Sequence, residues 1–228
     1  MINALFPLLQ LSDSNFPSGA FSHSFGLETY IQEQAITDKD SFTQAISVYI
    51  KKQLVFVEGL AVRLGFESVK QNRMSDFLEL DQLLFAGSLA QETRMGNRRI
   101  GERMAKLCTD LYPSPILIEY VNTIKSKQAY GHSALVFSII AYYLQVDQET
   151  AIGAYMFATV SSLIQNAVRG IPLGQTDGQK ILVEIQPLLK VAVKRILQLS
   201  EEDLGAVSPG LEIAQMRHER LHVRLFMS

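Results

Sequence analysis

The residues best suited to catalysis lie near the end of the chain, where His218-Glu219-Arg220-Leu221-His222 has H-E-x-x-H spacing. On a helix this spacing puts two imidazoles on one face, with the glutamate as the general base of a zinc protease. Such a site also needs a third protein ligand, and the residues after His222 include no His, Asp, Glu or Cys. A helical metalloenzyme that uses His218, Glu219 and His222, with His23 or His132 converging on them, is therefore the alternative hypothesis. A basic amphipathic terminal helix is the simpler interpretation.

Residues 171–179, Ile-Pro-Leu-Gly-Gln-Thr-Asp-Gly-Gln, are rich in turn-forming residues ahead of an expected helix. A phosphate-binding loop would need Gly-x-x-x-x-Gly-Lys followed by Ser or Thr, with a strand before it. Here three residues separate Gly174 from Gly178, and no strand is expected upstream. The pattern favours a helix start capped by Thr176 or Asp177, with a loop that faces a partner as its functional version.

Basic side chains recur at helical spacing in one segment, at Arg94, Arg98, Arg99, Arg103 and Lys106. This spacing favours a solvated face with ion pairs between residues four apart, and a docking patch for an acidic partner is the alternative. Gly96 and Gly101 in the same segment each cost a helix about 1 kcal/mol relative to alanine. We therefore expect another helix to approach closely at these glycines.

Bulk composition bounds the class of protein. The chain has 228 residues and a formal net charge of −2, which argues against bulk binding of nucleic acid. The single cysteine, Cys108, excludes an intrachain disulfide and indicates a reducing compartment. No Lys or Arg precedes Lys39, so no secretory signal is predicted, and the apolar run Ala134–Leu144 is too short to span a bilayer. We expect a cytoplasmic protein in which Cys108 is a small buried hydrophobe.

Helical periodicity dominates the elements that must position these residues. Thr37-x-x-Asp40 resembles a capping box, and apolar residues then recur every three or four positions to about residue 61. Further helices are predicted after Ser75-Asp76 and over about 89–111, 116–128, 132–145, 148–168, 175–199 and 211–222. The segments Ala134–Leu144 and Ala151–Leu163 are apolar on nearly all sides, which is typical of central helices. His132 is expected to cap its helix or to bond backbone in the core.

Fold class follows from this pattern, since strand-like alternation is almost absent. We predict one all-α domain over residues 1–228, a layered bundle of about nine to ten helices, with residues 209–228 as a C-terminal helix and partner-binding tail. An unusual loop joins two apolar segments near the start, where Phe16, Phe21 and Phe25 accompany a cluster of turn-forming residues. We expect this loop to pack against the body or a partner.

Four blocks of sequence carry a family resemblance. They are Leu9–Glu28, Gly131–Ala134, Ile171–Gln179 and the ending from His218-Glu219 through Arg224-Leu225-Phe226-Met227-Ser228. In this order and at this spacing, the chain resembles the UreF family of urease accessory proteins. The resemblance implies an all-helical, dimeric, non-enzymatic protein that joins UreD (also called UreH), the GTPase UreG and urease apoprotein in GTP-dependent nickel insertion. Nickel and GTP would belong to that complex, so no cofactor is expected here.

Partner contacts are expected from residues in these blocks and near them: Phe21, His23, Tyr30, Arg169, Gln175, Asp177, His218, Glu219, Arg224, Leu225 and Phe226. The resemblance suggests that Tyr30 and Arg224 help to build the surface that recruits the GTPase, through cation–π contact. Any arginine that assists GTP hydrolysis, such as Arg169, would act in the partner's site. Gly170 is expected to give the following loop a flexible entry. We also expect a homodimer, and a tail that is mobile alone and ordered under a partner.

Overall fold

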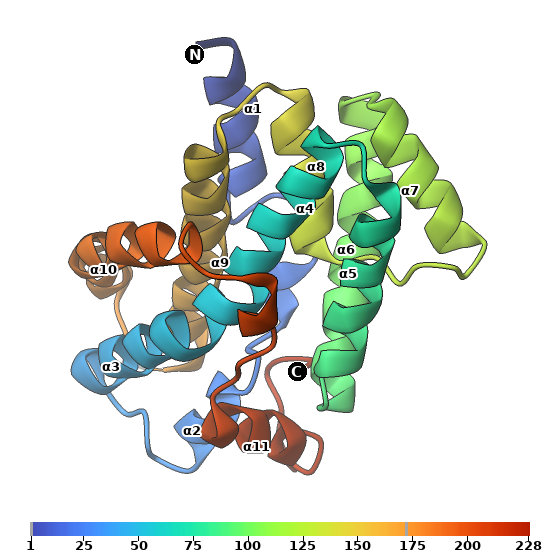
Figure 1. The fold of residues 1–228 in the computed structure, drawn as a ribbon. Coiled ribbons are helices and arrows are strands. Elements are labelled where there is room, and N and C mark those ends of the chain that lie inside the picture. The colour runs from blue at the N-terminus through green and yellow to red at the C-terminus, as the bar shows by residue number, and fades with distance from the viewer. Residues whose placement is uncertain (1, 172) are drawn as a thin grey trace.

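The structure is a computed structural model that describes residues 2–171 and 173–228. Within these residues it is helical throughout and contains no strand (Figure 1). The α-helices are α1 (Ile2–Ser12), α2 (Leu27–Gln32), α3 (Lys39–Tyr49), α4 (Leu60–Lys70), α5 (Met74–Gly87), α6 (Gln91–Leu111), α7 (Pro115–Lys125), α8 (Ser133–Tyr143), α9 (Gln148–Gly170), α10 (Gln175–Ile196) and α11 (Pro209–His218). A π-helical segment, η2 (Ile50–Gly59), joins α3 to α4 without a break, so the described residues form ten helical rods. The prediction of an all-α bundle of nine to ten helices is confirmed.

The long rod from α3 to α4 begins one residue later than the predicted capping box implies. Asp38 is the N-cap residue, and its carboxylate accepts a 2.9 Å hydrogen bond from the backbone N–H of Ser41. The Ser41 hydroxyl in turn accepts from the Asp38 backbone N–H at 3.1 Å. The reciprocal pair is therefore Asp38 and Ser41, not Thr37 and Asp40, because the serine hydroxyl takes the role that Glu or Gln usually fills.

Two central helices make up the interior, as their all-apolar sequences predict. Eight consecutive residues of α8, Ala134–Ala141, are buried, and α4 packs along it. Helix α9 is long and apolar enough to cross a membrane, but more than half of its most apolar window is buried within the fold. Helices α1, α4, α8 and α10 contact α9, so its apolar character is accounted for by the core.

Close neighbours explain the two glycines of α6, but these neighbours are a loop and a side chain and not a second helix. A Cβ on Gly101 would lie 2.6 Å from the carbonyl oxygen of Gly131, in the loop before α8. A Cβ on Gly96 would lie 2.8 Å from the His23 ring. The prediction of close approach is confirmed, and the expectation of an approaching helix is wrong at both positions, because a loop and a side chain fill the space.

A buried carboxylate fixes the loop that approaches Gly101. Asp81 of α5 is fully buried and accepts hydrogen bonds from Tyr120 Oη at 2.6 Å, from the Tyr130 N–H at 2.6 Å and from the Gly131 N–H at 3.0 Å. Burial and the neighbouring Asp81 raise the pKa of Tyr120, so its hydroxyl stays protonated and donates. His132 follows this loop, and its Nδ1 caps α8 by accepting from the Ala134 N–H at 3.2 Å, as predicted.

The structure also bears on the predictions for Cys108, for the basic face of α6 and for the helices at the two ends of the chain. Cys108 is buried without a disulfide partner, as expected. Arg98 pairs with Glu102 at 2.8 Å on a half-exposed face of α6, which fits the solvated face. Helix α1 was not predicted and forms despite Pro7, and it extends beyond the body of the molecule (Figure 1). The predicted helix over 211–222 is shorter, because α11 ends at His218.

Candidate functional site

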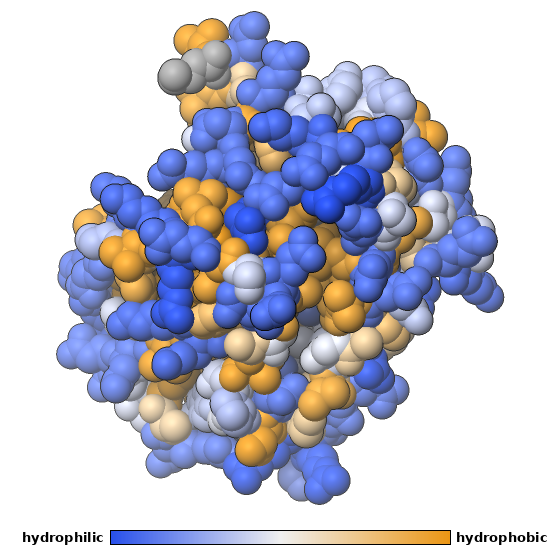
Figure 2. Space-filling model, viewed as in Figure 1, coloured by the Kyte–Doolittle hydropathy of each residue, from blue (hydrophilic) through white to orange (hydrophobic). Residues whose placement is uncertain are grey.

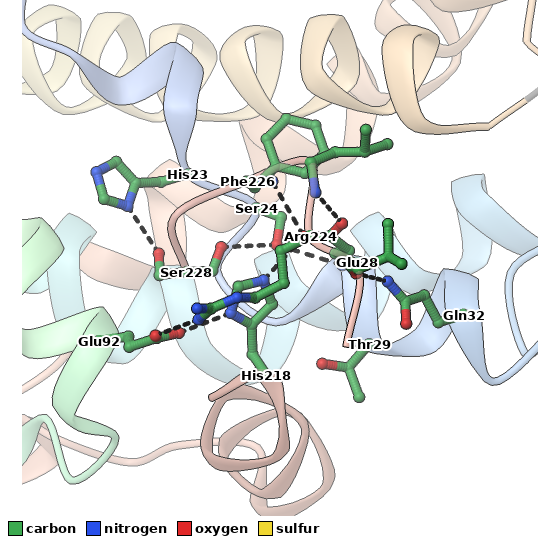
Figure 3. A network of polar contacts seen from close by, with 12 residues as sticks. His23, Ser24, Glu28, Thr29, Gln32, Glu92, His218, Arg224, Phe226 and Ser228 are labelled. Carbon is green, nitrogen blue, oxygen red and sulfur yellow. Dashed lines mark hydrogen bonds and ion pairs between the residues drawn. The ribbon is translucent and has the colours of Figure 1, made fainter. Parts of the chain in front are cut away.

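The last ten residues fold back over the chain's own N-terminal loop. We call this region the tail junction: residues 219–228 together with the side chains they contact from residues 20–32, α6, α9 and α11 (Figure 3). A terminal oxygen of Ser228 accepts from the backbone N–H groups of Ser24 and Phe25 at 2.6 and 3.0 Å, and from Ser24 Oγ at 2.7 Å. The Ser228 hydroxyl also lies 2.8 Å from His23 Nδ1. The C-terminal residue is thus held on three sides by the loop.

Glu28 is the acceptor that fixes the rest of the tail. Its buried carboxylate accepts from the backbone N–H groups of Leu225 and Phe226, at 2.6 and 3.2 Å. The same carboxylate lies 2.8 Å from Nε2 of the buried His218. Charge-assisted hydrogen bonds of this kind are stronger than neutral ones, so one α2 side chain connects the end of α11 to the tail.

A second carboxylate closes the network from α6. Glu92 lies 2.7 Å from His218 Nδ1 and 2.6 Å from Arg224 Nη1. The two nitrogens of His218 therefore face two different carboxylates, an arrangement in which both donate when both carry a proton. Because the four side chains Glu28, Glu92, His218 and Arg224 come from α2, α6, α11 and the tail, they tie together four separate parts of the sequence (Figure 3).

Side chains of the tail alternate between outward and inward positions. Val223, Leu225 and Met227 are exposed by 71%, 67% and 50%, whereas Phe226 and Ser228 are exposed by only 8% and 1%. The segment bends at residues 222–223 and 225–226, and from Leu225 to Ser228 exposed side chains alternate with buried ones. The docked tail thereby displays an exposed row of three apolar side chains, which we call the outward row (Val223, Leu225, Met227).

Phe226 enters a site formed by the end of α9. A Cβ on Gly170 would lie 3.4 Å from the Phe226 ring, which is ordinary van der Waals contact. The Arg169 guanidinium carbon lies 5.7 Å from the centre of the Phe226 ring and 5.9 Å from that of Phe21. Arg169 also donates to the Phe21 carbonyl oxygen at 2.5 Å. Gly170 is the last residue of α9, and the expectation that it gives the following loop a flexible entry stays a prediction.

His23 is held in its neutral form in this junction. Burial, and after it the positive charges of Arg99 and Arg103, lower its pKa to about 4. Its ring stacks on Phe25 at 5.6 Å between centroids, and its backbone carbonyl accepts from Asn166 of α9 at 2.7 Å. The aromatic loop is therefore packed against the body, as expected from its sequence.

The structure corrects several assignments made from the sequence. His222 lies beyond the end of α11 and is exposed, whereas His218 is buried. The two histidines thus do not share a helical face, and the metalloenzyme hypothesis loses the geometry on which it rests. Arg224 pairs with Glu92 instead of stacking on Tyr30, and Tyr30 packs beside Gly210 of α11.

The tail lies docked on its own chain. The expectation that it is mobile in the isolated protein and ordered under a partner stays a prediction. Most of the remaining candidates meet at the tail junction. They are Phe21, His23, Arg169, His218, Arg224, Leu225 and Phe226. Glu219 lies at the start of the tail.

Gln175 and Asp177 are the two candidates placed elsewhere. They lie in the first turn of α10, whose N-cap is Gly174, so the prediction of Thr176 or Asp177 as the cap is wrong. Asp177 pairs with Lys180 at 3.1 Å. Within the described part of the chain, neither residue shares a hydrogen bond or ion pair with the tail.

Sequence reasoning missed the residues that hold the tail, namely the acceptors Glu28 and Glu92 and the donor Ser24. Nothing in their local sequence marks them, because Glu28 and Glu92 look like ordinary first-turn acidic residues of helices. Their roles arise from partners that are more than 100 residues away in the chain.

Comparison with known proteins bears on the whole chain. The family model described as UreF matches residues 36–186. The chain is 71% identical over 227 residues to a protein of Bacillus sp. (strain TB-90) named "Urease accessory protein UreF", with full coverage of both chains. The chain belongs to the UreF family.

Two further relatives with the same name extend this result. The Geobacillus kaustophilus protein is 53% identical over 221 residues, covering 97% of this chain and 96% of its own. The Lachnoclostridium phytofermentans protein is 49% identical over 228 residues, with full coverage of both chains. The UreF family model covers neither residues 20–32 nor the tail, residues 219–228, whereas the full-length matches to UreF relatives extend through both.

Proposed function

We propose that this protein acts as a non-catalytic urease accessory protein in GTP-dependent nickel insertion. It would bridge a UreD/UreH-type partner and the GTPase UreG on urease apoprotein, and would regulate GTP hydrolysis by UreG. Membership of the UreF family, whose named relatives are urease accessory proteins, carries the proposal. Nickel and GTP would be bound by the partner complex, without a cofactor resident in this chain.

The tail junction supports a partner-binding role over a catalytic one. Its two buried or half-buried carboxyl groups are engaged within the chain, since Glu28 and Glu92 contact His218, Arg224 and two backbone N–H groups. The outward row on the docked tail and the half-exposed ring of Phe21 are apolar groups that face solvent. Apolar side chains rimmed by charged ones are typical of protein interfaces. We therefore infer that the outward row contacts a UreD/UreH-type or UreG-type partner.

A homodimer is the second part of this proposal. Helix α1 extends beyond the body and exposes Ile2, Leu5, Phe6 and Leu9, and Figure 2 shows apolar colour on this projection. Two exposed valines of α10, Val183 and Val191, add a further apolar surface. A two-fold dimer is the commonest way to cover such surfaces. We propose that the dimer forms in the cytoplasm, where urease apoprotein would also be found.

The experiment separates tail docking from partner contact. In cells that carry the urease genes, the triple variant Val223→Ser/Leu225→Ser/Met227→Ser should abolish co-purification with the partners and lower the nickel content of urease. It should leave the chain's unfolding midpoint unchanged, because all three side chains point outward. The matched control is Val48→Ser/Ile118→Ser, at exposed apolar positions on α3 and α7 that lie outside both proposed surfaces. Full urease activation by the triple variant would refute the role of the outward row, and full activation in cells lacking the protein would refute the proposed function.

A further inference from the structure

The basic residues of α6 differ in their surroundings. Arg98 pairs with Glu102 at 2.8 Å. Arg99, Arg103 and Lys106 are exposed, and among the described residues no carboxylate lies within ion-pair distance of them. Because they follow one another four and three positions apart, they share one face of the helix. We call these three residues the α6 basic row.

Two members of the row lie beside the loop that joins α1 to α2. A Cβ on Gly19 would collide with Nη1 of Arg103, so the Arg103 guanidinium rests on the loop backbone. Gly19 has a φ of 89°, a left-handed conformation that glycine adopts without strain. Burial, and after it the positive charges of Arg99 and Arg103, lower the pKa of His23. Both guanidiniums therefore lie near the imidazole at the far end of this loop.

A third guanidinium reaches the same loop from α9. The guanidinium carbon of Arg169 lies 5.9 Å from the centre of the Phe21 ring, and Arg169 donates to the Phe21 carbonyl oxygen at 2.5 Å. Asn166 of the same helix donates to the carbonyl oxygens of Ala20 and His23, at 3.4 and 2.7 Å. Arg169 has no carboxylate partner within the described part of the chain. The loop is therefore held between guanidiniums from two helices, α6 and α9.

Phe21 projects from this loop and is 55% exposed. The hydrogen bonds from α9 fix the backbone on either side of it, so little conformational entropy remains to be lost when the ring is covered. Aromatic anchors of this kind carry much of the binding energy at protein interfaces. Arg169 also lies 5.7 Å from the centre of the Phe226 ring, so Phe21 is a neighbour of the docked tail and its outward row.

Carboxylates close to this loop are already engaged. Glu92 lies 2.6 Å from Nη1 of Arg224. Asp13, the one acidic residue of the loop before His23, accepts from the Asn15 N–H at 2.8 Å. The positive charges of the α6 basic row and Arg169 are thus left for a second molecule. Guanidinium groups bind carboxylates through paired hydrogen bonds, which makes an acidic surface the matching chemistry.

We propose that this loop surface, in which the α6 basic row and Arg169 flank Phe21, docks an acidic segment of a protein partner. Carboxylates of that segment would pair with the guanidiniums, and an apolar site beside them would receive the Phe21 ring. The proposal deepens the proposed function and rests on it for the identity of the partner. Opposite charges chiefly raise the association rate, so binding should weaken as the salt concentration rises.

The first test uses poly-L-glutamate as a probe of known chemistry, with the full-length protein at low ionic strength. Fluorescence anisotropy of the labelled polymer should show saturable binding that weakens as sodium chloride is added. The variant Arg99→Gln/Arg103→Gln/Lys106→Gln should weaken this binding by about fivefold or more, as the loss of three exposed ion pairs implies. Its unfolding midpoint should match that of the unaltered protein, because all three side chains are exposed.

The matched control removes three positive charges from exposed positions elsewhere on the surface. It is Lys51→Gln/Lys70→Gln/Lys125→Gln, on η2, α4 and α7, and it should leave the binding of poly-L-glutamate nearly unchanged. Equal weakening by both variants, or no binding of poly-L-glutamate, would overturn the proposal. A short DNA duplex is the second probe. Tighter binding of the duplex than of poly-L-glutamate would assign the surface to nucleic acid and would also overturn the proposal.

The second test separates this inference from the proposed function. In cells that carry the urease genes, the variant of the α6 basic row and Phe21→Ser should each reduce co-purification with the UreD/UreH-type or UreG-type partner. If the unaltered protein and both variants co-purify equally with these partners at low and high salt, the docking surface is refuted and the proposed function stands. If the unaltered protein co-purifies with no urease protein, the proposed function fails, and the titration with poly-L-glutamate still decides the chemistry of the surface.

Discussion

Glu28→Gln should release the tail while leaving the bundle intact. The carboxylate accepts from two tail N–H groups, those of Leu225 and Phe226, and contacts His218. A hydrogen bond to a charged group contributes about 1.5–3 kcal/mol and a neutral one about 0.5–1.5 kcal/mol, so each tail contact should lose about 1 kcal/mol. The tail-docking equilibrium should therefore fall by about 2 kcal/mol, or roughly thirtyfold.

Hydrogen exchange of the peptide that covers residues 219–228 measures this change directly. We expect its protection to fall by about thirtyfold, together with faster tryptic cleavage after Arg220 and Arg224. Protection in α8 and α9 should stay unchanged, because Glu28 contacts neither helix through a hydrogen bond. The control is Glu33→Gln, which removes an exposed pair with Arg217 and should cost less than about 1 kcal/mol. Unchanged tail protection in Glu28→Gln would show that the carboxylate does not hold the tail.

Three further predictions concern the body of the fold. Gly101→Ala should destabilise the protein by about 1–3 kcal/mol through overpacking against the Gly131 backbone. Gly153→Ala, whose Cβ would lie 3.8 Å from Val193, should instead stabilise it by up to about 1 kcal/mol. Urea unfolding measures both changes, and equal effects of the two variants would contradict the packing argument. Tyr120→Phe should lower the free energy of unfolding by about 1–3 kcal/mol, because it removes the hydrogen bond to Asp81 and leaves the His132 N–H without its acceptor. An unchanged unfolding midpoint would count against this network. The native pKa of His132 is about 4, below its unfolded value, so the unfolded chain binds more protons and stability falls on acidification. His132→Gln should remove up to about 2 kcal/mol of the loss between pH 6.5 and 5, and an unaltered pH slope in urea unfolding would refute this assignment.

Local sequence by itself determined the helical architecture. Apolar periodicity predicted the central helices, because residues that recur every three or four positions share one face of a helix wherever the chain later places it. The all-apolar segment Ala134–Leu144 predicted burial, and eight consecutive residues of α8, Ala134–Ala141, are buried. The histidine before it predicted a cap, which His132 provides. These are properties of a few neighbouring residues, and neighbouring residues are sufficient to fix them.

Tertiary structure alone decided the tail junction. An H-E-x-x-H spacing predicts a shared helical face only if the helix continues, and α11 ends at His218, where Glu28 and Glu92 hold the imidazole. The glycines of α6 predicted that other atoms approach the helix closely, but they did not predict that these atoms belong to Gly131 and His23. In the sequence Glu58 is one of several polar residues of a helical segment, and only the folded structure buries its carboxyl group. Hydrogen bonds and burial of this kind join residues more than 100 positions apart, and no local pattern encodes which distant donor will meet which acceptor.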